Sequence, residues 1–380
     1  MNYKETLFFV AKCLTINHEA HNKRIVEEVL QSNAVDWDEV VKLSTAHFVF
    51  PALYCNLKRA SFLSYLPEDL VDYMKYITEL NRERNEEIIA QAKELNTLLL
   101  EHNITPIFIK GTGNLLEGLY EDISERMVGD IDFIFSPEDY PRAIKILTKN
   151  EYNSEYEIIK YFLTKTRHYP RLTNKNKIAA IEIHKELLIK KYAKEFNYNF
   201  IKDSVQILNG ISVLSFKNQF SLTIAAIQIN DYGFYNRSLV LRNAYDVFLL
   251  SKKTTANNAF KKFNRLEHPL NCFLASCYKL FNKPESLQYT SSKKIKKYLV
   301  LFYKYINNRK LAEQKNKKTY KKETRKKLIL YRFRIILYSF FYKKYRSHLV
   351  KKILKRFRQK KTNSIGDTKT LNQVLNFLKI

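Results

Sequence analysis

The chain has 380 residues, 45% of them apolar, so it can bury a sizeable core divided between two or three structural units. Its net charge of +28 is concentrated in residues 293–361, where 27 Lys and Arg accompany only Glu313 and Glu323 and supply +25. The remaining +3 is ordinary for a soluble domain, so the composition excludes a basic surface spread over the whole chain.

Cysteine usage and hydropathy narrow the class of protein further. The four cysteines form no CxxC pair and have no His at zinc-ligand spacing, which favours free buried thiols over a disulfide framework. The apolar run at residues 7–11 lacks the order of a signal peptide, and no stretch reaches the ~20 apolar residues that span a bilayer. We expect a cytoplasmic protein, with a peripheral position at the inner face of the membrane as an open alternative.

Helical patterns fill the first hundred residues. Within residues 70–99, apolar side chains recur at spacings of three and four and so form one stripe of a long helix. Asn103 is the expected stop, because Asn tolerates the left-handed conformation at a helix end. Residues 106–109 are apolar and rich in β-branched and aromatic side chains, and Lys110-Gly-Thr-Gly113 follows at once. This order predicts a buried strand, a tight turn and a helix over residues 114–120.

Two more strands are expected downstream. Residues 130–135 have strand composition, and a helix over residues 137–149 follows with a proline in its first turn. Residues 177–184 alternate, which places Glu182 and His184 on the same face of a strand. The polar side chains of this strand therefore point away from the apolar core.

The elements together predict an α+β fold. Helical patterns return at residues 219–230 and 238–252, so a small mixed sheet with helices lies between helical flanks. We expect a helical N-terminal region at 1–103, an α+β core at 104–216, a helical region packing on the core at 217–292, and a basic aromatic helical tail at 293–380.

Asp130 and Asp132 share one face of their predicted strand, because side chains alternate with a period of two. Adjacent carboxylates repel one another unless a cation joins them, and Mg²⁺ favours one or two carboxylates together with phosphate oxygens. Two such ions roughly 3.5 to 4 Å apart clamp the attacking and leaving oxygens of a phosphoryl displacement. The turn that begins at Gly111 offers backbone N–H groups to a triphosphate, and Glu182 offers a third carboxylate. The pattern favours metal-dependent phosphoryl chemistry.

Three segments occur in an order that resembles a known family: Phe108-Ile-Lys-Gly111, then Tyr120 with Arg126-Met-Val-Gly-Asp-Ile-Asp132, then Ile181-Glu-Ile-His184. Over roughly residues 35–255, the chain is similar to the uncharacterised bacterial nucleotidyltransferase family of the DNA polymerase β-like superfamily. The resemblance implies a polymerase β-like nucleotidyltransferase core between helical N- and C-terminal regions.

The resemblance also implies roles for individual residues. Asp130 and Asp132 would hold Mg²⁺ or Mn²⁺, and Glu182 would complete the metal site or take the proton from the acceptor hydroxyl. The implied nucleotide-binding residues are Lys110, Gly111, Thr112, Arg126 and Gly129, with Arg126 either neutralising phosphate or anchoring the Gly129 turn. The implied activity moves a nucleoside monophosphate from an NTP, expected to be ATP, to an unknown acceptor hydroxyl or phosphate and releases pyrophosphate.

Structural explanations remain open for these residues. The two aspartates suit a solvated strand end, and the third acid suits a strand surface. Lys110 and Arg126 suit ordinary ion pairs with those acids, and His184 suits a strand histidine bonded to the backbone. Arg242 and Asp246 lie four apart on a predicted helix, where an intrahelical ion pair would explain them.

The basic segment at residues 293–361 allows three interpretations. Residues 328–357 interleave Leu, Ile, Tyr and Phe with Lys and Arg. This pattern suits a cationic helix on an anionic membrane surface, RNA binding through phosphates and stacked bases, or a helical appendage on the core. The alternative to an enzyme is a non-catalytic protein that keeps the nucleotide-binding fold and acts through this tail on RNA or membrane.

Overall fold

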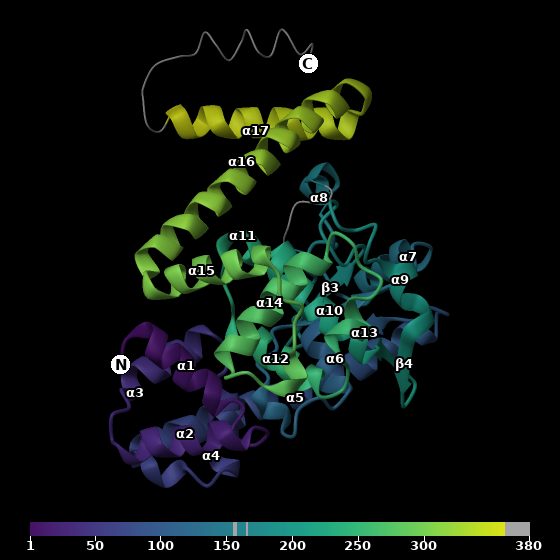
Figure 1. The fold of residues 1–380 in the computed structure, drawn as a ribbon. Coiled ribbons are helices and arrows are strands. Elements are labelled where there is room, and N and C mark those ends of the chain that lie inside the picture. Colours follow the sequence, from purple (N-terminus) through teal and green to yellow (C-terminus); the bar gives the residue numbers. More distant parts are fainter. Residues whose placement is uncertain (155–157, 165, 362–380) are drawn as a thin grey trace. The chain divides into compact units, whose positions relative to one another are not determined.

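The computed structural model describes residues 1–154, 158–164 and 166–361. It confirms the α+β class, with many helices around one five-stranded mixed sheet (Figure 1). The chain divides into two compact units. Unit 1 comprises Met1–Tyr156 and Arg167–Thr319, and unit 2 comprises Glu157–Thr166 and Tyr320–Ile380.

The N-terminal region of unit 1 is helical throughout, as the pattern predicts. Its helices are α1 (Tyr3–Cys13), α2 (Ala20–Gln31), α3 (Trp37–Ala46), α4 (Phe50–Arg59) and α5 (Glu68–Leu100), with a 3₁₀ turn at Leu63–Tyr65. Asn2 and Asp36 cap the first turns of α1 and α3 with their side-chain oxygens. Asn103 has a φ of 55°, so the expected left-handed stop after α5 is confirmed.

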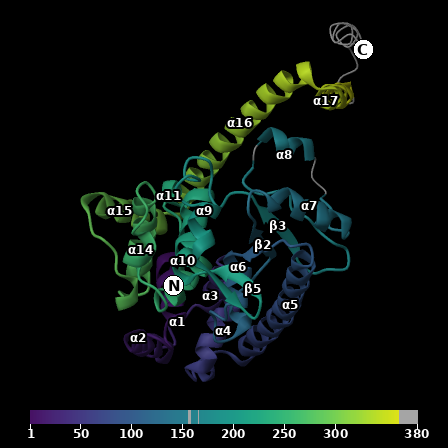
Figure 2. The same cartoon turned by 90° about the vertical axis from the view of Figure 1, so that its right-hand side faces the viewer.

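The sheet has the strand order β3-β2-β1-β5-β4. Figure 2 labels three of its strands, β3, β2 and β5. Its strands are β1 (Ile107–Phe108), β2 (Asp130–Ile134), β3 (Ala180–His184), β4 (Val205–Leu208) and β5 (Ile211–Leu214). β2 runs parallel to β3 and antiparallel to β1, and β1 runs parallel to β5. Phe108, Phe133 and Val213 are buried, so the centre of the sheet is part of the apolar core.

Helices surround this sheet in unit 1. They are α6 (Lys110–Leu116), α7 (Asp139–Lys149), α9 (Tyr198–Ile201), α10 (Phe216–Ala225), α11 (Gly233–Asn236), α12 (Leu241–Ser251), α13 (Ala256–Phe260), α14 (Glu267–Leu280) and α15 (Lys293–Asn307), with 3₁₀ turns at Ile123–Glu125, Lys202–Ser204 and Glu285–Leu287. A π-helical turn, Ala226–Asn230, follows α10 where the pattern predicts one continuous helix. The tight turn expected at 110–113 is wrong, because these residues form the start of α6, and the helix expected at 114–120 lies four residues earlier. The Gln219 side chain bonds both backbone groups of Lys110 at this helix start.

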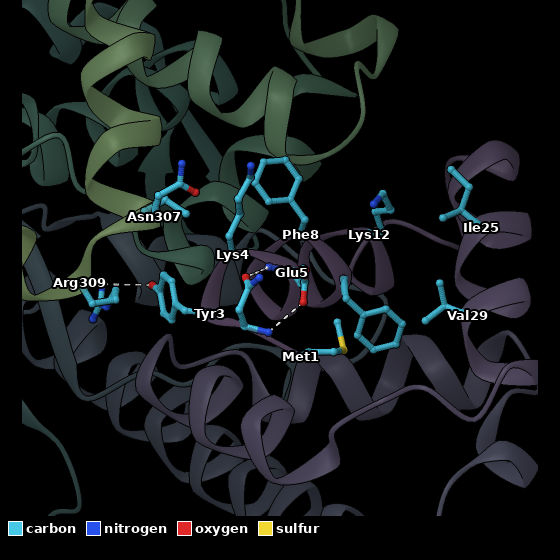
Figure 3. Close-up of a pocket in the computed structure, with 13 residues that line it drawn as sticks. Met1, Tyr3, Lys4, Glu5, Phe8, Lys12, Ile25, Val29, Asn307 and Arg309 are labelled. Atoms are coloured by element: carbon cyan, nitrogen blue, oxygen red, sulfur yellow. Dashed lines mark hydrogen bonds between the residues drawn. The ribbon is translucent and has the colours of Figure 1, made fainter.

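The four cysteines are free and buried, which confirms the expectation from their spacing. α15 belongs to unit 1, since Tyr298, Phe302 and Ile306 are buried. A cavity of about 630 Å³ lies where the end of α15 and the start of α16 (Arg309–Phe341) meet α1 (Figure 3). There Arg309 donates to the Tyr3 hydroxyl at 3.3 Å and lies 4.2 Å from the ring centroid. The first turn of α16 is thus held to the N-terminal helices.

Unit 2 has a small core of its own. It contains α8 (Ile158–Thr164), the remainder of α16, and α17 (Lys343–Lys361). Leu163 of α8 is buried with Tyr331 and Ile335 of α16, and Arg334 Nη1 donates to the Leu163 carbonyl at 2.8 Å. Two segments far apart in sequence therefore form one packed unit. No helix in the described ranges is long and apolar enough to cross a membrane.

Candidate functional site

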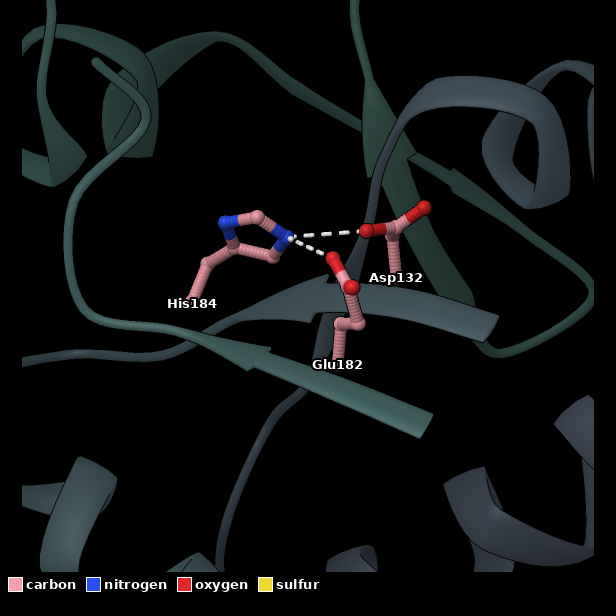
Figure 4. Close-up of side chains that lie close together, drawn as sticks. All are labelled: Asp132, Glu182 and His184. Atoms are coloured by element: carbon pink, nitrogen blue, oxygen red, sulfur yellow. Dashed lines mark hydrogen bonds and ion pairs between the residues drawn. The ribbon is translucent and has the colours of Figure 1, made fainter. Parts of the chain in front are cut away.

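The pairing of β2 with β3 places two acids side by side. Asp132 lies opposite Glu182 in the parallel ladder, and Ile134 lies opposite His184. The period of two turns Glu182 and His184 to the same face of β3, where they meet Asp132 (Figure 4). One ligand atom from each of these three side chains lies within 4.8 Å of the others. This trio is hereafter the acid–histidine cluster.

Lys110 supplies a cation to this cluster. Its Nζ lies 2.5 Å from Asp132 Oδ1, 3.6 Å from Glu182 Oε2 and 3.2 Å from His184 Nε2. The residue has a φ of 57°, a conformation that costs a side-chain-bearing residue about 1 kcal/mol or more. The bonds from the Gln219 amide to its backbone hold this conformation in place. A strained backbone thus directs an ammonium group at the carboxylates.

Glu182 is held in its ionised form. Burial by itself raises the pKa of Glu182, but the hydrogen bond with His184 and the charge of Lys110 outweigh it, so the pKa is lowered overall. A charged carboxylate beside Asp132 is the state that a divalent cation needs.

His184 faces two groups with opposite demands. The ammonium of Lys110 needs a lone pair on Nε2, whereas the Asp132 carboxylate, 2.8 Å from the same nitrogen, needs a proton there. A neutral ring meets only one demand at a time. Its other nitrogen, Nδ1, is buried and has no hydrogen-bond partner among the described residues. A cation in place of the ammonium would accept the Nε2 lone pair together with both carboxylates, so the residues fit a divalent metal.

Asp130 lies at the edge of the acid–histidine cluster. Its carboxylate pairs with Arg171, and its backbone carbonyl accepts a hydrogen bond from Thr112 Oγ1 at 2.9 Å. Burial raises the pKa of Asp130, and the charge of Arg171 partly offsets this. The structure therefore brings together Asp132, Glu182 and Lys110, while Asp130 borders the same cavity from a separate ion pair.

A cavity of about 310 Å³ opens beside these acids, near the small end of the range for ligand pockets. Three arginines, Arg126, Arg167 and Arg242, line it together with Lys110 and Asp132. Arg167 Nη1 and Arg242 Nε are both buried without a hydrogen-bond partner in the part of the chain that the structure describes. Burial, helped by the charge of Arg126, lowers the pKa of Arg242 to about 10. Buried N–H donors without acceptors are costly, so each of these two groups can donate to an acceptor that enters the cavity.

Arg126 is an anchor in this structure. Its guanidinium pairs with Asp246 of α12 at 3.0 Å and donates to the Met127 carbonyl at 2.7 Å. Asp246 also accepts a hydrogen bond from the Tyr120 hydroxyl at 2.8 Å. The expected intrahelical pair of Arg242 with Asp246 is therefore wrong. Arg242 instead lies 4.8 Å from the Phe48 ring centroid, which sequence spacing alone does not reveal.

Gly111 and Gly129, the two glycines predicted to bind the nucleotide, have different surroundings. A Cβ on Gly111 would lie 3.1 Å from Val128 Cγ2 and 3.4 Å from Arg126 Nη2, so the first turn of α6 packs closely on the residues that precede β2. A Cβ on Gly129 would meet nothing within 4 Å. Space explains a small residue at 111 but not at 129.

The fold and the acid–histidine cluster define an α+β nucleotidyltransferase core flanked by helices. The family described as "Uncharacterised nucleotidyltransferase" matches residues 33–284, and the chain belongs to that family. Neither the curated proteins nor the solved structures give a match. The cluster of Asp132, Glu182 and His184 could hold a divalent metal, which agrees with this membership.

Proposed function

We propose that the chain transfers a nucleoside monophosphate from an NTP, most simply ATP, to an acceptor hydroxyl or phosphate. The observation that carries the proposal is the β2–β3 register, which sets Asp132 beside Glu182 with Asp130 two residues away. These acids line the same cavity as Arg167 and Arg242, each of which has a buried N–H group with no partner among the described residues. The arrangement suits a metal on one side of a polyphosphate and cationic side chains on the other.

In this reaction an acceptor oxygen attacks the α-phosphorus of the NTP. The new P–O bond forms as the bond to the β-phosphate oxygen breaks, and pyrophosphate leaves with the electron pair. Asp130, Asp132 and Glu182 would hold Mg²⁺ or Mn²⁺, which neutralises charge on the phosphates and the leaving group when bound. If Glu182 were not a metal ligand, its carboxylate would instead take the proton of the acceptor hydroxyl. The lowered pKa keeps this carboxylate ionised but makes it a weak base, so it favours the metal-binding role.

Lys110 and the two arginines complete the proposal. The ammonium of Lys110 lies 2.5 Å from the Asp132 carboxylate and would leave it if that carboxylate held a divalent cation. The released ammonium can then pair with a phosphate oxygen in the same cavity. Arg167 and Arg242 supply donors to the remaining phosphate oxygens, since each has a buried N–H group without a partner among the residues described. Binding a nucleotide would thus satisfy groups that are unsatisfied without it.

Label transfer tests the proposed reaction. The full chain is incubated with α-³²P-labelled ATP, Mg²⁺ and a cell extract that supplies the acceptor, and labelled product is measured beside pyrophosphate. We expect Mg²⁺-dependent labelling that Asp132→Asn abolishes and that Asp203→Asn, at an exposed acid, leaves unchanged. Equal labelling with wild type and Asp132→Asn would contradict the proposal.

One observation favours a non-catalytic alternative. Each acid implied in metal binding already has a cationic partner from the chain: Lys110 for Asp132 and Glu182, and Arg171 for Asp130. Such pairing lets the fold tolerate these acids without metal. A chain that binds ATP equally well with and without Mg²⁺ and never releases pyrophosphate would be a binding protein.

A further inference from the structure

The second half of α16 has apolar side chains on two opposite faces. One face belongs to the core of unit 2, where Tyr331 and Ile335 are buried against Leu163. The other face points to solvent. It carries Ile329, Phe333, Ile336 and Phe340, which are 57%, 65%, 50% and 71% exposed. Their spacings of four, three and four residues put them on one line along the helix, hereafter the exposed stripe.

Neighbouring residues widen this apolar surface. Leu330, Leu337 and Phe341 lie beside the exposed stripe and are also classed among the exposed large hydrophobic residues. Scattered single exposures are common on protein surfaces, but a contiguous apolar patch marks a place where something binds. The exposed stripe is therefore an interaction surface in need of an occupant.

Positive charge surrounds the exposed stripe. Residues 320–361 contain 17 Lys and Arg and a single acid, Glu323, for a net charge of +16. Lys322 and Arg325 continue the line of the exposed stripe toward the start of α16, and both are exposed. Lys343 and Lys344, exposed at the start of α17, flank its other end. A partner that covers this surface must combine an apolar interior with a negatively charged rim.

We propose that unit 2 binds the surface of an anionic lipid bilayer, with the exposed stripe in the interfacial region and the surrounding lysines and arginines at the headgroups. The apolar body of the bilayer accepts Phe333 and Phe340, and acidic headgroups complement the charge. Arg332 and Arg334 interrupt the apolar run, and no helix in the described ranges can span a bilayer, so the helix lies on the membrane.

The two competing occupants fit the surface less well. RNA would attract the same basic residues, but Ile329 and Ile336 have no aromatic face on which a base can stack. A second copy of the chain would cover the exposed stripe, but it would bring a second 320–361 segment, also of net charge +16, against the first. Of these three occupants, the bilayer is the one that complements both the aliphatic residues and the charge.

α8 ties this surface to the catalytic fold along the chain. It lies in sequence between β2, which carries Asp132, and β3, which carries Glu182. Because α8 belongs to the core of unit 2, the proposed lipid-binding unit is built from two segments of the chain rather than from a tail alone. The inference goes beyond the proposed nucleotidyl transfer and does not depend on it.

Vesicle co-sedimentation of the full chain tests the proposal. The probes are vesicles of phosphatidylcholine alone and of phosphatidylcholine mixed with phosphatidylglycerol, at low and high salt. We expect binding only to the mixed vesicles and weaker binding at high salt, because salt screens the attraction. The double variant Phe333→Ser/Phe340→Ser should lower the affinity roughly tenfold or more, since two aromatic side chains no longer enter the apolar phase.

A matched control removes two exposed apolar residues from unit 1. Ile207→Ser/Tyr76→Ser changes exposed side chains of similar size and should bind vesicles like wild type. Thermal melting of each variant shows that it remains folded. Absence of binding to mixed vesicles at low salt, or equal binding by wild type and the stripe variant, overturns the proposal. Binding of single-stranded RNA alone, or a dimer that the stripe variant dissociates without vesicle binding, would assign the surface to RNA or to a second copy.

Discussion

The acids of β2 and β3 in unit 1 and the exposed stripe of unit 2 differ in how their charges are balanced. On β2 and β3 each acid has a cationic partner from another part of the chain, as Asp132 has Lys110 and Asp130 has Arg171. In residues 320–361 of unit 2, 17 Lys and Arg accompany one acid, and apolar side chains lie exposed among them. Charge balanced inside a fold serves chemistry or stability, whereas charge left unbalanced at a surface serves binding.

The largest expected effect comes from breaking a buried pair in unit 1. Asp246→Ala leaves Arg126 buried without its carboxylate and removes the acceptor of the Tyr120 hydroxyl. We expect a loss of about 3 to 5 kcal/mol in the free energy of unfolding, measured by urea denaturation. Glu94→Ala, which breaks the exposed pair with Lys177, should cost less than about 1 kcal/mol. Equal losses would erase the distinction between buried and surface charge.

A pH titration of stability tests the cost of charging a buried side chain. Burial lowers the pKa of His47 to about 4, below its ordinary value of 6.5. The folded state therefore favours the neutral ring, so its contribution is present above pH 6.5 and is lost as the pH falls toward 4. We expect wild type to lose up to about 3 kcal/mol over this range relative to His47→Gln. Burial raises the pKa of Glu117 to about 7, which acts in the opposite direction, so the informative quantity is the difference between the two chains.

A substitution that creates a cavity in unit 2 tests whether α8 and α16 form one core. Leu163→Ala removes a fully buried side chain from the cluster with Tyr331 and Ile335. We expect a local loss of about 2 to 4 kcal/mol, seen as faster hydrogen exchange in α16. Exchange in β2 and β3 should not change. Unaltered protection of α16 would mean that α8 does not stabilise it.

The smallest effect concerns competition for Asp132. Lys110→Met removes the ammonium that pairs with this carboxylate, so a divalent cation no longer has to displace it. We expect Mn²⁺ to bind roughly tenfold more tightly, measured by electron paramagnetic resonance. Lys145→Met, an exposed lysine of α7, is the matched control. Weaker Mn²⁺ binding in Lys110→Met would show that the lysine supports the metal rather than replaces it.

Local patterns in the sequence predicted the parts of the fold that depend on neighbours along the chain. Strand composition around Asp132 and alternation around Glu182 predicted their strands, and Asn103 predicted the end of α5. The ion pair of Arg126 with Asp246 spans 120 residues, and the packing of Leu163 on Ile335 joins still more distant segments. Periodicity carries no information about such partners, because only tertiary packing brings them together.

An ion pair of Lys110 with the strand acids was among the alternatives that the sequence left open, and the structure confirms it. The backbone geometry behind this pair was hidden. The approach of Lys110 to Asp132 depends on a positive φ that Gln219 maintains from 109 residues away. His184 was an open alternative, since its spacing from Glu182 suited both a ligand and a buried strand residue. What resolved its place was the parallel register of β2 and β3.

The most direct test of the central claim is isothermal titration of the full chain with ATP, with and without Mg²⁺, for wild type and Asp132→Asn. The acids of β2 and β3 should require a divalent cation before the polyphosphate binds productively. We predict that Mg²⁺ strengthens ATP binding to wild type at least tenfold, by about 1.4 kcal/mol or more, and that Asp132→Asn loses this dependence. Mg²⁺-dependent ATP binding that is the same in both chains would contradict the assignment of Asp132 to the metal site.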